Sequence, residues 1–141
     1  MFEAGFYKLL ISDAGIAGLL SGSPAARADQ TSGVFPIQLP EASTLPALVY
    51  TVIHGQSVTS VQGTDAMETK RVQIECYGRH AEDVAALQSS VKNCLLSYRG
   101  SLSDGTVMCG AFKRGELGAF EHAPLLYRGE IDFDVLIINT N

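Results

Sequence analysis

The chain has 141 residues, of which 46% are hydrophobic and 18% charged, a composition typical of a folded protein of one domain. Its 15 acidic and 10 basic side chains give a net charge of -5 without any block of Lys and Arg, which disfavours tight binding along a nucleic-acid backbone. No apolar run approaches the roughly 20 residues of a membrane span, so no membrane partner is expected.

The N-terminal residues 2–20 have a helical pattern of apolar side chains with a break near Ser12. Asp13 is a plausible N-cap for a second short helix over residues 14–20, because its carboxylate can accept hydrogen bonds from the first turn. The segment that follows, over residues 21–33, is small, polar and contains a proline. It is typical of a surface loop.

Two strands are expected in the next part of the chain. Val34 to Leu39 predicts a short strand, and Pro36 favours the edge of a sheet over its middle. Ala47 to His54 is apolar on both faces and predicts a central strand. Gly55 to Lys70 has little core pattern and predicts a long arm or hairpin between two strands, and loops of this length usually bind something or are disordered.

The stretch from Thr69 to Arg99 predicts a strand running directly into a helix. Val72, Ile74 and Cys76 alternate with polar residues, and the strand should end near Gly78. From residue 81 the period changes to three and four, and Gly100 supplies a stop. The expected buried stripe consists of Val84, Leu87, Val91, Cys94, Leu95 and Tyr98. The side chains expected to face away are Gln88, Ser89, Lys92 and Asn93.

The C-terminal part predicts a strand over residues 106–113, a glycine-containing connector over 114–124, and a last strand with a clear period of two. On one face of the last strand lie Ile131, Phe133, Val135 and Ile137. The other face carries Glu130, Asp132 and Asp134, about 7 Å apart, an acidic row that needs solvent, cationic partners or a function.

Together these elements predict an α+β fold over residues 1–141. We expect a mixed, mostly antiparallel sheet of about five strands packed against one long helix, with a helical N-terminus.

The cysteines give no sign of a disulfide framework or a metal site. Cys76, Cys94 and Cys109 make an odd count, and two of them lie on apolar stripes, which favours reduced core thiols in a cytoplasmic protein. Cys76 and His80 lack the paired spacing of a zinc site.

Other catalytic signatures are also missing from the sequence. His54 and His122 lie at the ends of expected strands, where a hydrogen-bonded surface histidine is the default and a catalytic base is uncommon. No nucleophile elbow, phosphate loop or dinucleotide motif follows a strand. We therefore expect no catalytic residue, no metal and no cofactor, and a protein that is not an enzyme.

In the order of its elements the chain resembles the tail terminator (tail completion, minor tail protein U-like) family of long-tailed bacteriophages and prophages. Proteins of this family typically have a proline before the second strand, here Pro46, and an arginine before an acidic and apolar last strand, here Arg128. The chain departs from the family at His80, where a Ser, Thr or Asp cap is usual. The likeness is carried by FYKLLISDAGIAGLL, VFPIQLP followed by LPALVYTVIHGQ, VQIECYG followed by HAEDVAAL, and YRGEIDFDVLI.

The resemblance implies a structural virion protein with no enzymatic role. Such proteins form hexameric rings on the head-proximal end of the tail tube, stop its growth and present a surface to the head. The implied partners are other copies of the chain, the major tail tube protein and the head-tail connector proteins, with DNA only passing through the lumen. The implied location is the virion, after a period in the host cytoplasm.

Two groups of residues are candidates for these contacts. The first is the arm over residues 55–70, where we expect contact with the tube or a neighbouring subunit chiefly through Thr64, Asp65, Met67, Glu68 and Lys70. The second is the acidic row of Glu130, Asp132 and Asp134, which would keep DNA from sticking if it faced the lumen.

Two alternatives stay open. The first is a head-tail connector adaptor, which has similar size and charge. The second is a small α+β ligand-binding or enzymatic domain, which a deep pocket with convergent polar groups would reveal.

Overall fold

The structure, a computed structural model, describes residues 2–20, 33–37, 45–58, 67–124 and 126–138. Its helices are α1 (Phe2–Ser12), α2 (Ala14–Leu20) and α3 (Ala81–Ser97). Its strands are β1 (Val34–Pro36), β2 (Ala47–Val58), β3 (Met67–Gly78), β4 (Gly100–Ser101), β5 (Val107–Ala123) and β6 (Leu126–Ile138). In this part of the chain no helix is long and apolar enough to cross a membrane.

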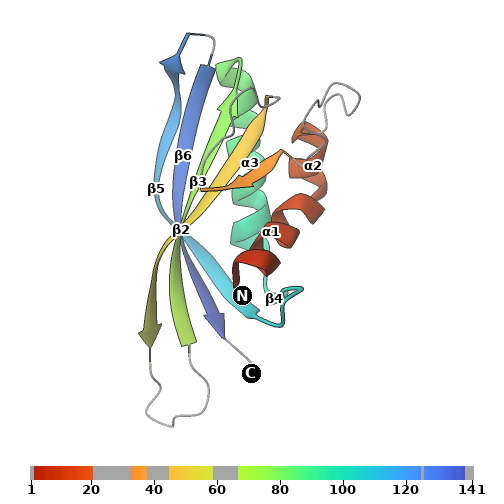
Figure 1. Cartoon of the computed structure of the whole chain (residues 1–141), viewed down its shortest axis with the longest axis vertical. Coiled ribbons are helices and arrows are strands. Elements are labelled where there is room, and N and C mark those ends of the chain that lie inside the picture. Colours follow the sequence, from red (N-terminus) through yellow and green to blue (C-terminus); the bar gives the residue numbers. More distant parts are fainter. Residues whose placement is uncertain (1, 21–32, 38–44, 59–66, 125, 139–141) are drawn as a thin grey trace.

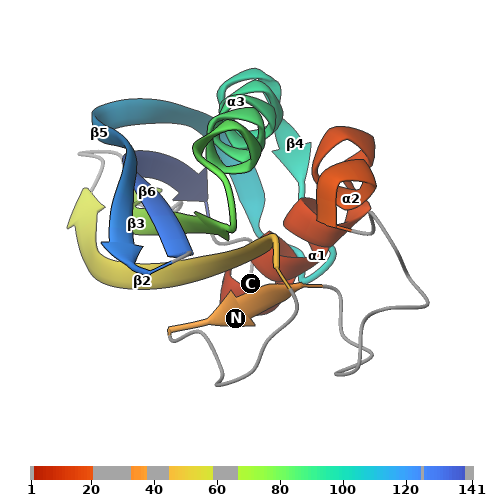
Figure 2. The same cartoon turned by 90° about the horizontal axis from the view of Figure 1, so that it is seen from above.

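The strands form one sheet of six in the order β1-β2-β3-β6-β5-β4. β1 runs parallel to β2, and all other neighbours are antiparallel. The sheet curls into a half-barrel, with the helices beside it (Figures 1 and 2). The predicted α+β fold of about five strands against one long helix is therefore wrong. The described chain is mostly sheet, and its three helices are short, with 17 residues in the longest, α3.

The N-terminal helices form as the sequence predicts. The break falls at Asp13, whose Oδ2 accepts a hydrogen bond of 3.0 Å from the backbone nitrogen of Ile16 and so caps α2. The aromatic ring of Phe6 packs against Tyr50 of β2, with ring centroids 6.0 Å apart. This contact fixes α1 to the sheet.

The core lies between the helices and one face of the sheet. Every second residue of β6 points into it, and so does the alternating set of β3, which confirms the predicted period of two. These buried sheet residues are Val72, Ile74, Cys76, Ile131, Phe133, Val135 and Ile137. The predicted stripe of α3 meets them with Val84, Leu87, Val91, Cys94 and Leu95.

α3 begins where the sequence predicts, and His80 makes no side-chain capping bond. The helix ends at Ser97, ahead of the expected stop, and Gly100 belongs to β4 with a φ of +143°. One predicted orientation is wrong. Gln88 is buried, and its Nε2 donates a hydrogen bond of 2.9 Å to the backbone oxygen of Leu117 in β5.

The same hydrogen bond contacts a segment whose predicted structure is wrong. The connector predicted over residues 114–124 is in fact the continuation of β5, which pairs with β6 as far as Ala123. The strand changes register at four places, and one of them, between Leu117 and Phe120, lies next to the Gln88 contact. Bulges leave backbone groups unpaired in the ladder, and Gln88 satisfies one of them.

The structure also refines the predictions for β2 and the arm. β1 pairs only with Leu48 to Tyr50, so the predicted central strand is open along the rest of its outer edge in the described chain. The first and last residues of the arm are strand, with Gly55 opposite Lys70 and Val58 opposite Met67. The described ends of the arm therefore continue the β2-β3 pair, which agrees with the hairpin alternative of the prediction. Its residues 59–66, including the predicted contacts Thr64 and Asp65, lie outside the described residues.

Asp104 fixes the turn between β4 and β5 to the start of α1. Its Oδ2 accepts a hydrogen bond of 3.2 Å from the backbone nitrogen of Gly5, and its Oδ1 accepts one of 3.0 Å from that of Thr106. Partial burial works to raise the pKa of Asp104, but these hydrogen bonds outweigh it and hold the pKa below its ordinary value. The ionised carboxylate therefore stabilises the fold.

Asp104→Asn is expected to cost about 1 kcal/mol at pH 7, because an amide can accept only one of the two hydrogen bonds. A depressed pKa contributes stability above the unfolded-state pKa of about 4, and that contribution is lost as the pH falls through the folded-state pKa. Urea unfolding from pH 7 to pH 2.5 should show the difference between wild type and variant shrinking at the acid end. A difference that stays constant would contradict this assignment.

Candidate functional site

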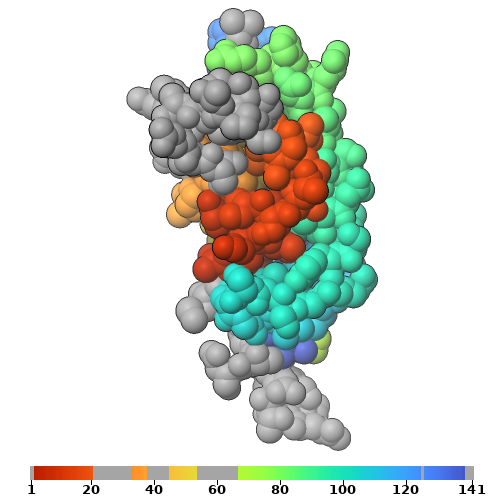
Figure 3. Space-filling model, turned by 90° about the vertical axis from the view of Figure 1, so that its right-hand side faces the viewer, coloured from red at the N-terminus to blue at the C-terminus, as the bar shows by residue number. Residues whose placement is uncertain are grey.

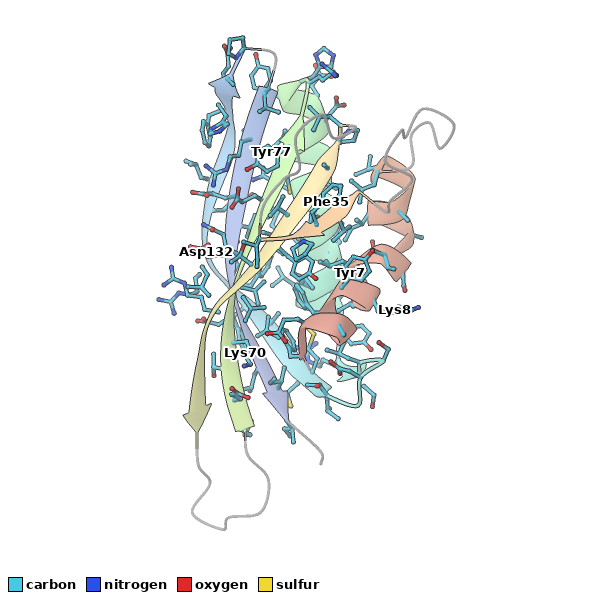
Figure 4. All side chains as sticks on the ribbon, viewed as in Figure 1. Tyr7, Lys8, Phe35, Lys70, Tyr77 and Asp132 are labelled. Carbon is cyan, nitrogen blue, oxygen red and sulfur yellow. The ribbon has the colours of Figure 1, made fainter. Side chains whose placement is uncertain are left out.

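The sheet has a face without helices, which we call the helix-free face. It is formed by the residues that alternate with the core positions of β3 and β6, together with their neighbours on β2 and β5. Figure 4 shows Asp132 on this side, with the helices on the other. The acidic row of Glu130, Asp132 and Asp134 lies on this face, because these residues alternate with the core residues of β6. All three are half-buried.

Each carboxylate of the acidic row has an arginine partner. Arg71 Nη2 lies 3.3 Å from Asp132 Oδ2, and Arg114 Nη1 lies 2.9 Å from Asp134 Oδ2. Arg128 Nη2 lies 2.8 Å from Glu130 Oε2. The acidic row is therefore part of a lattice of ion pairs. Of the three possibilities that the sequence left open for it, namely solvent, cationic partners or a function, the structure shows cationic partners.

Arg128 joins this lattice to a second carboxylate. Its Nε lies 3.0 Å from Glu75 Oε2, which also accepts a hydrogen bond of 2.5 Å from the Tyr77 hydroxyl. Burial and this hydrogen bond raise the pKa of Tyr77 to about 12. Burial works to lower the pKa of Arg128, but the carboxylates of Glu75 and Glu130, together with the nearby Tyr77 hydroxyl, raise it above its ordinary value. This end of the face is thus a closed network of satisfied charges.

The charges within this lattice of ion pairs nearly cancel. The three arginines of the lattice stand against four carboxylates, those of the row and Glu75, which leaves a single net negative charge. An open depression of about 220 Å³ at the centre of the face is lined by Gly115, Glu116, Leu117, Glu130 and Asp132. It is small for a ligand pocket, which typically spans at least about 300 Å³.

Apolar side chains are exposed beside this lattice. On β5, Phe112 is 61% exposed and Leu117 is 49% exposed, and on β2 Ile53 is 48% exposed. A second, smaller apolar cluster covers part of the same face, and its buried members are Phe35, Ala47, Val49 and Tyr77. The sequence pattern did not single out the exposed residues, because exposure on a strand depends on which neighbours the sheet supplies.

The other predicted contact residues lie at the far end of β3. Glu68 and Lys70 pair with each other, with Nζ and Oε1 3.0 Å apart, and their side chains are only about one-fifth exposed. Met67 is also half-buried and lies opposite Ile138 of β6. These described members of the arm are thus built into the sheet.

The helix side carries two adjoining depressions of about 360 and 230 Å³ between α1 and the C-terminal end of α3. Figure 3 shows this side of the molecule, where α1 lies against the segment that follows α3 and α2 lies beside α3 itself. Three of the hydroxyl groups around them are used within the fold: Ser12 donates to the backbone oxygen of Lys8, Ser97 to that of Asn93, and Tyr98 to that of Ser101. The charged residues Lys8, Asp13 and Arg99 also line these depressions.

The three cysteines are all free thiols. Cys76 and Cys94 are buried, and Cys109 is half-buried. Burial raises the pKa of Cys76, and burial together with the nearby carboxylate of Asp13 raises that of Cys94 to about 12. Thiols in this state are poor nucleophiles. Within the described residues, no group of His, Cys, Asp and Glu side chains is placed to hold a metal ion.

Comparisons with known proteins give a likeness of structure. No family model matches the chain, and no curated protein matches its sequence. Among solved structures, the chain is similar to one chain of the virion of a native gene transfer agent particle, with a TM-score of 0.65 and 16% identity. The likeness covers 96% of this chain and 93% of that one. At this identity it shows a shared fold over nearly the whole length.

Proposed function

We propose that the protein is a structural component of a phage-like virion, and within it the tail terminator. On this proposal, copies of the chain form a ring of six on the head-proximal end of the tail tube, stop its polymerisation and provide the head-joining surface. The role is assembly, without catalysis.

The observation that carries the proposal is the fold shared with a chain of the gene transfer agent virion, since it extends over nearly all of both chains. The resemblance of the sequence to tail terminators, in the order of its elements, points to the same class. The described surface supports an assembly role, because large apolar side chains are exposed on β2 and β5.

A tail terminator needs two kinds of contact surface, and the chain offers candidates for both. A ring requires two different patches on each subunit that meet head to tail. Contact with the tube or a neighbouring subunit is assigned to the arm over residues 55–70. Its strands extend the β2-β3 pair, and its remaining residues connect the two.

The helix-free face is the candidate for the lumen. Its ion pairs leave it close to neutral, so that it would neither attract passing DNA nor repel it strongly. Electron cryomicroscopy of the particle can decide this point, since Glu130, Asp132 and Asp134 should then line the channel. A position of all three on the outer wall would refute it.

Deletion of the gene is expected to change the particles seen by electron microscopy in lysates. Overlong or headless tails should appear beside DNA-filled heads that lack tails, and the wild-type gene supplied in trans should restore virions. A gene lacking residues 59–66 should yield a folded protein that does not restore them. Normal virions after the deletion would refute the proposal, and restoration by the shortened gene would refute the role of the arm alone.

The same experiment separates the tail terminator from a head-tail connector adaptor. Loss of an adaptor on the head side leaves tails of normal length that do not join, whereas loss of the terminator releases control of tube length. The length distribution of free tails is therefore the deciding measurement.

A further inference from the structure

The sheet has two open edges that differ in character. Beyond Tyr50, no described residue pairs with the outer edge of β2 at residues 51–58. Beyond Met108, no described strand pairs with the outer edge of β5 as far as Ala123, and the contact from α3 to the β5 backbone is the hydrogen bond from Gln88 to the oxygen of Leu117. We call these segments the open β2 edge and the open β5 edge. Unpaired strand edges of this length are templates for pairing with another chain.

The open β2 edge lacks the features that usually prevent such pairing. Its sequence, TVIHGQSV, contains no charged residue and no proline, and it changes register only once, between Val52 and His54. Natural proteins protect edge strands with charges, prolines or frequent bulges. Ile53, at the register change, is also 48% exposed. An unprotected edge with an exposed apolar side chain is typical of a strand that is covered in an assembly.

The open β5 edge also presents apolar side chains, which could pack against those of the open β2 edge. Its cations are held within the subunit, because Lys113 pairs with Glu116 and Arg114 pairs with Asp134. The exposed side chains that remain available for contact are apolar, chiefly Phe112 and Leu117. The frequent register changes of β5 make it a poor template for an arbitrary strand, while residues 110–113 and 115–117 stay in regular register with β6.

The exposed apolar residues of the two edges lie at nearly the same position along the strand direction. His54 of β2 lies opposite Arg71, Arg71 opposite Asp134, and Asp134 opposite Phe112 of β5. His54, which follows Ile53 in β2, and Phe112 therefore lie at the two ends of one row that crosses four strands. A second copy that places its Ile53 beside Phe112 of the first needs little displacement along the strands. Such a contact repeats without rise and closes into a ring, whereas a large rise would give an open helix.

We propose that the open β2 edge of one copy packs against the open β5 edge of the next, with Ile53 lying against Phe112, and that this is the subunit interface of the ring. The inference rests on the proposed function, which supplies the need for a head-to-tail interface between identical chains.

Disulfide cross-linking in assembled particles tests this interface. Ile53→Cys and Phe112→Cys are combined in a Cys109→Ser background, supplied in trans to the deletion strain, and the purified particles are oxidised. Within one chain the two positions are separated by three strand spacings, about 14 Å when followed along the sheet, and two strands lie between them, so they cannot form a disulfide. We expect a ladder of covalent oligomers on a denaturing gel, and its loss on reduction.

Matched variants keep the test decisive. Thr51→Cys with Gly115→Cys probes the next row, because both positions align with Gln73 and Asp132. Leu96→Cys with Phe112→Cys should stay monomeric, since Leu96 is 39% exposed but lies on α3. Each cysteine alone should also give only monomers.

Three results would overturn the interface. The first is that both double-cysteine variants, 53 with 112 and 51 with 115, give only monomers in assembled particles. The others are dimers from Ile53→Cys alone and a cross-link from residue 53 to a different protein. In each case tails of controlled length would leave the proposed function standing. A different result would refute the proposed function instead. In that result the tails of the deletion strain grow without control, and neither the variants nor the wild-type gene supplied in trans restores their length.

Discussion

Replacing Gly129 by valine is expected to cost about 3 kcal/mol of folding stability and to lower the melting temperature by about 10 °C. Gly129 lies on β6 where α3 crosses the sheet. A Cβ atom at this position would lie 2.8 Å from Cδ of Gln88 and 2.9 Å from Cγ1 of Val84. A branched side chain would have to push the helix away from the strand or displace Gln88, whose hydrogen bond to Leu117 would be lost.

Thermal and urea unfolding of purified protein measure this effect. Gly115→Val is the matched control, because it also adds a branched side chain to a strand, and a Cβ there would meet nothing within 4 Å. The control should be neutral or slightly stabilising. Combining Gly129→Val with Gln88→Ala should cost less than the sum of the two changes, by more than about 0.5 kcal/mol. Equal losses at positions 115 and 129 would show that the close approach of α3 is unimportant.

The elements with strong internal periodicity could be predicted from sequence. α3 and β6 each bury one regular set of side chains, so the pattern of apolar residues follows directly from the geometry of the element. The break at Asp13 was also predictable, because the capping carboxylate acts on a nitrogen only three residues away. In these cases the decisive contacts are local or come from a single buried face.

β5 shows why the rest could not be predicted. Its second half, RGELGAFEHA, contains two glycines and four charged or ionisable residues, and a propensity argument assigns it to a loop. The segment is nevertheless a strand, because β6 supplies a continuous ladder beside it and Gln88 satisfies a backbone oxygen next to a register change. Both partners are distant in the chain. Counting the extra strand segments as loops is what led to the wrong fold class.

The candidate site follows the same division. The alternation of β6 places Glu130, Asp132 and Asp134 on one face, and this could be predicted from the last strand alone. Their arginine partners come from β3, β5 and β6, and which arginine meets which carboxylate depends on register between strands. The exposure of Ile53, Phe112 and Leu117 depends on where the neighbouring strands end. Register and strand ends are set by tertiary pairing, which the sequence pattern leaves open.

Replacing Arg128 by glutamine is expected to cost about 2 kcal/mol at pH 7. The loss of a buried ion-pair partner costs roughly 3–5 kcal/mol, and partial exposure reduces it here. The Arg128 side chain is 22% exposed, and those of Glu75 and Glu130 are 14% and 27% exposed. The substitution leaves these two carboxylates beside each other without their shared cation, while Glu75 still accepts the hydrogen bond from Tyr77.

Urea unfolding at pH 7 measures this effect, and three further variants separate its causes. Arg79→Gln is the matched control, because Arg79 is exposed and has no ion pair among the described residues, and it should be neutral. Arg128→Lys should recover only part of the loss, since an ammonium group cannot reproduce the two separate guanidinium contacts. Arg128→Gln with Glu75→Gln should be more stable than Arg128→Gln alone, because it removes one of the two unpaired charges. If instead the double variant is the less stable of the two, unpaired negative charge is not the cause of the loss in Arg128→Gln.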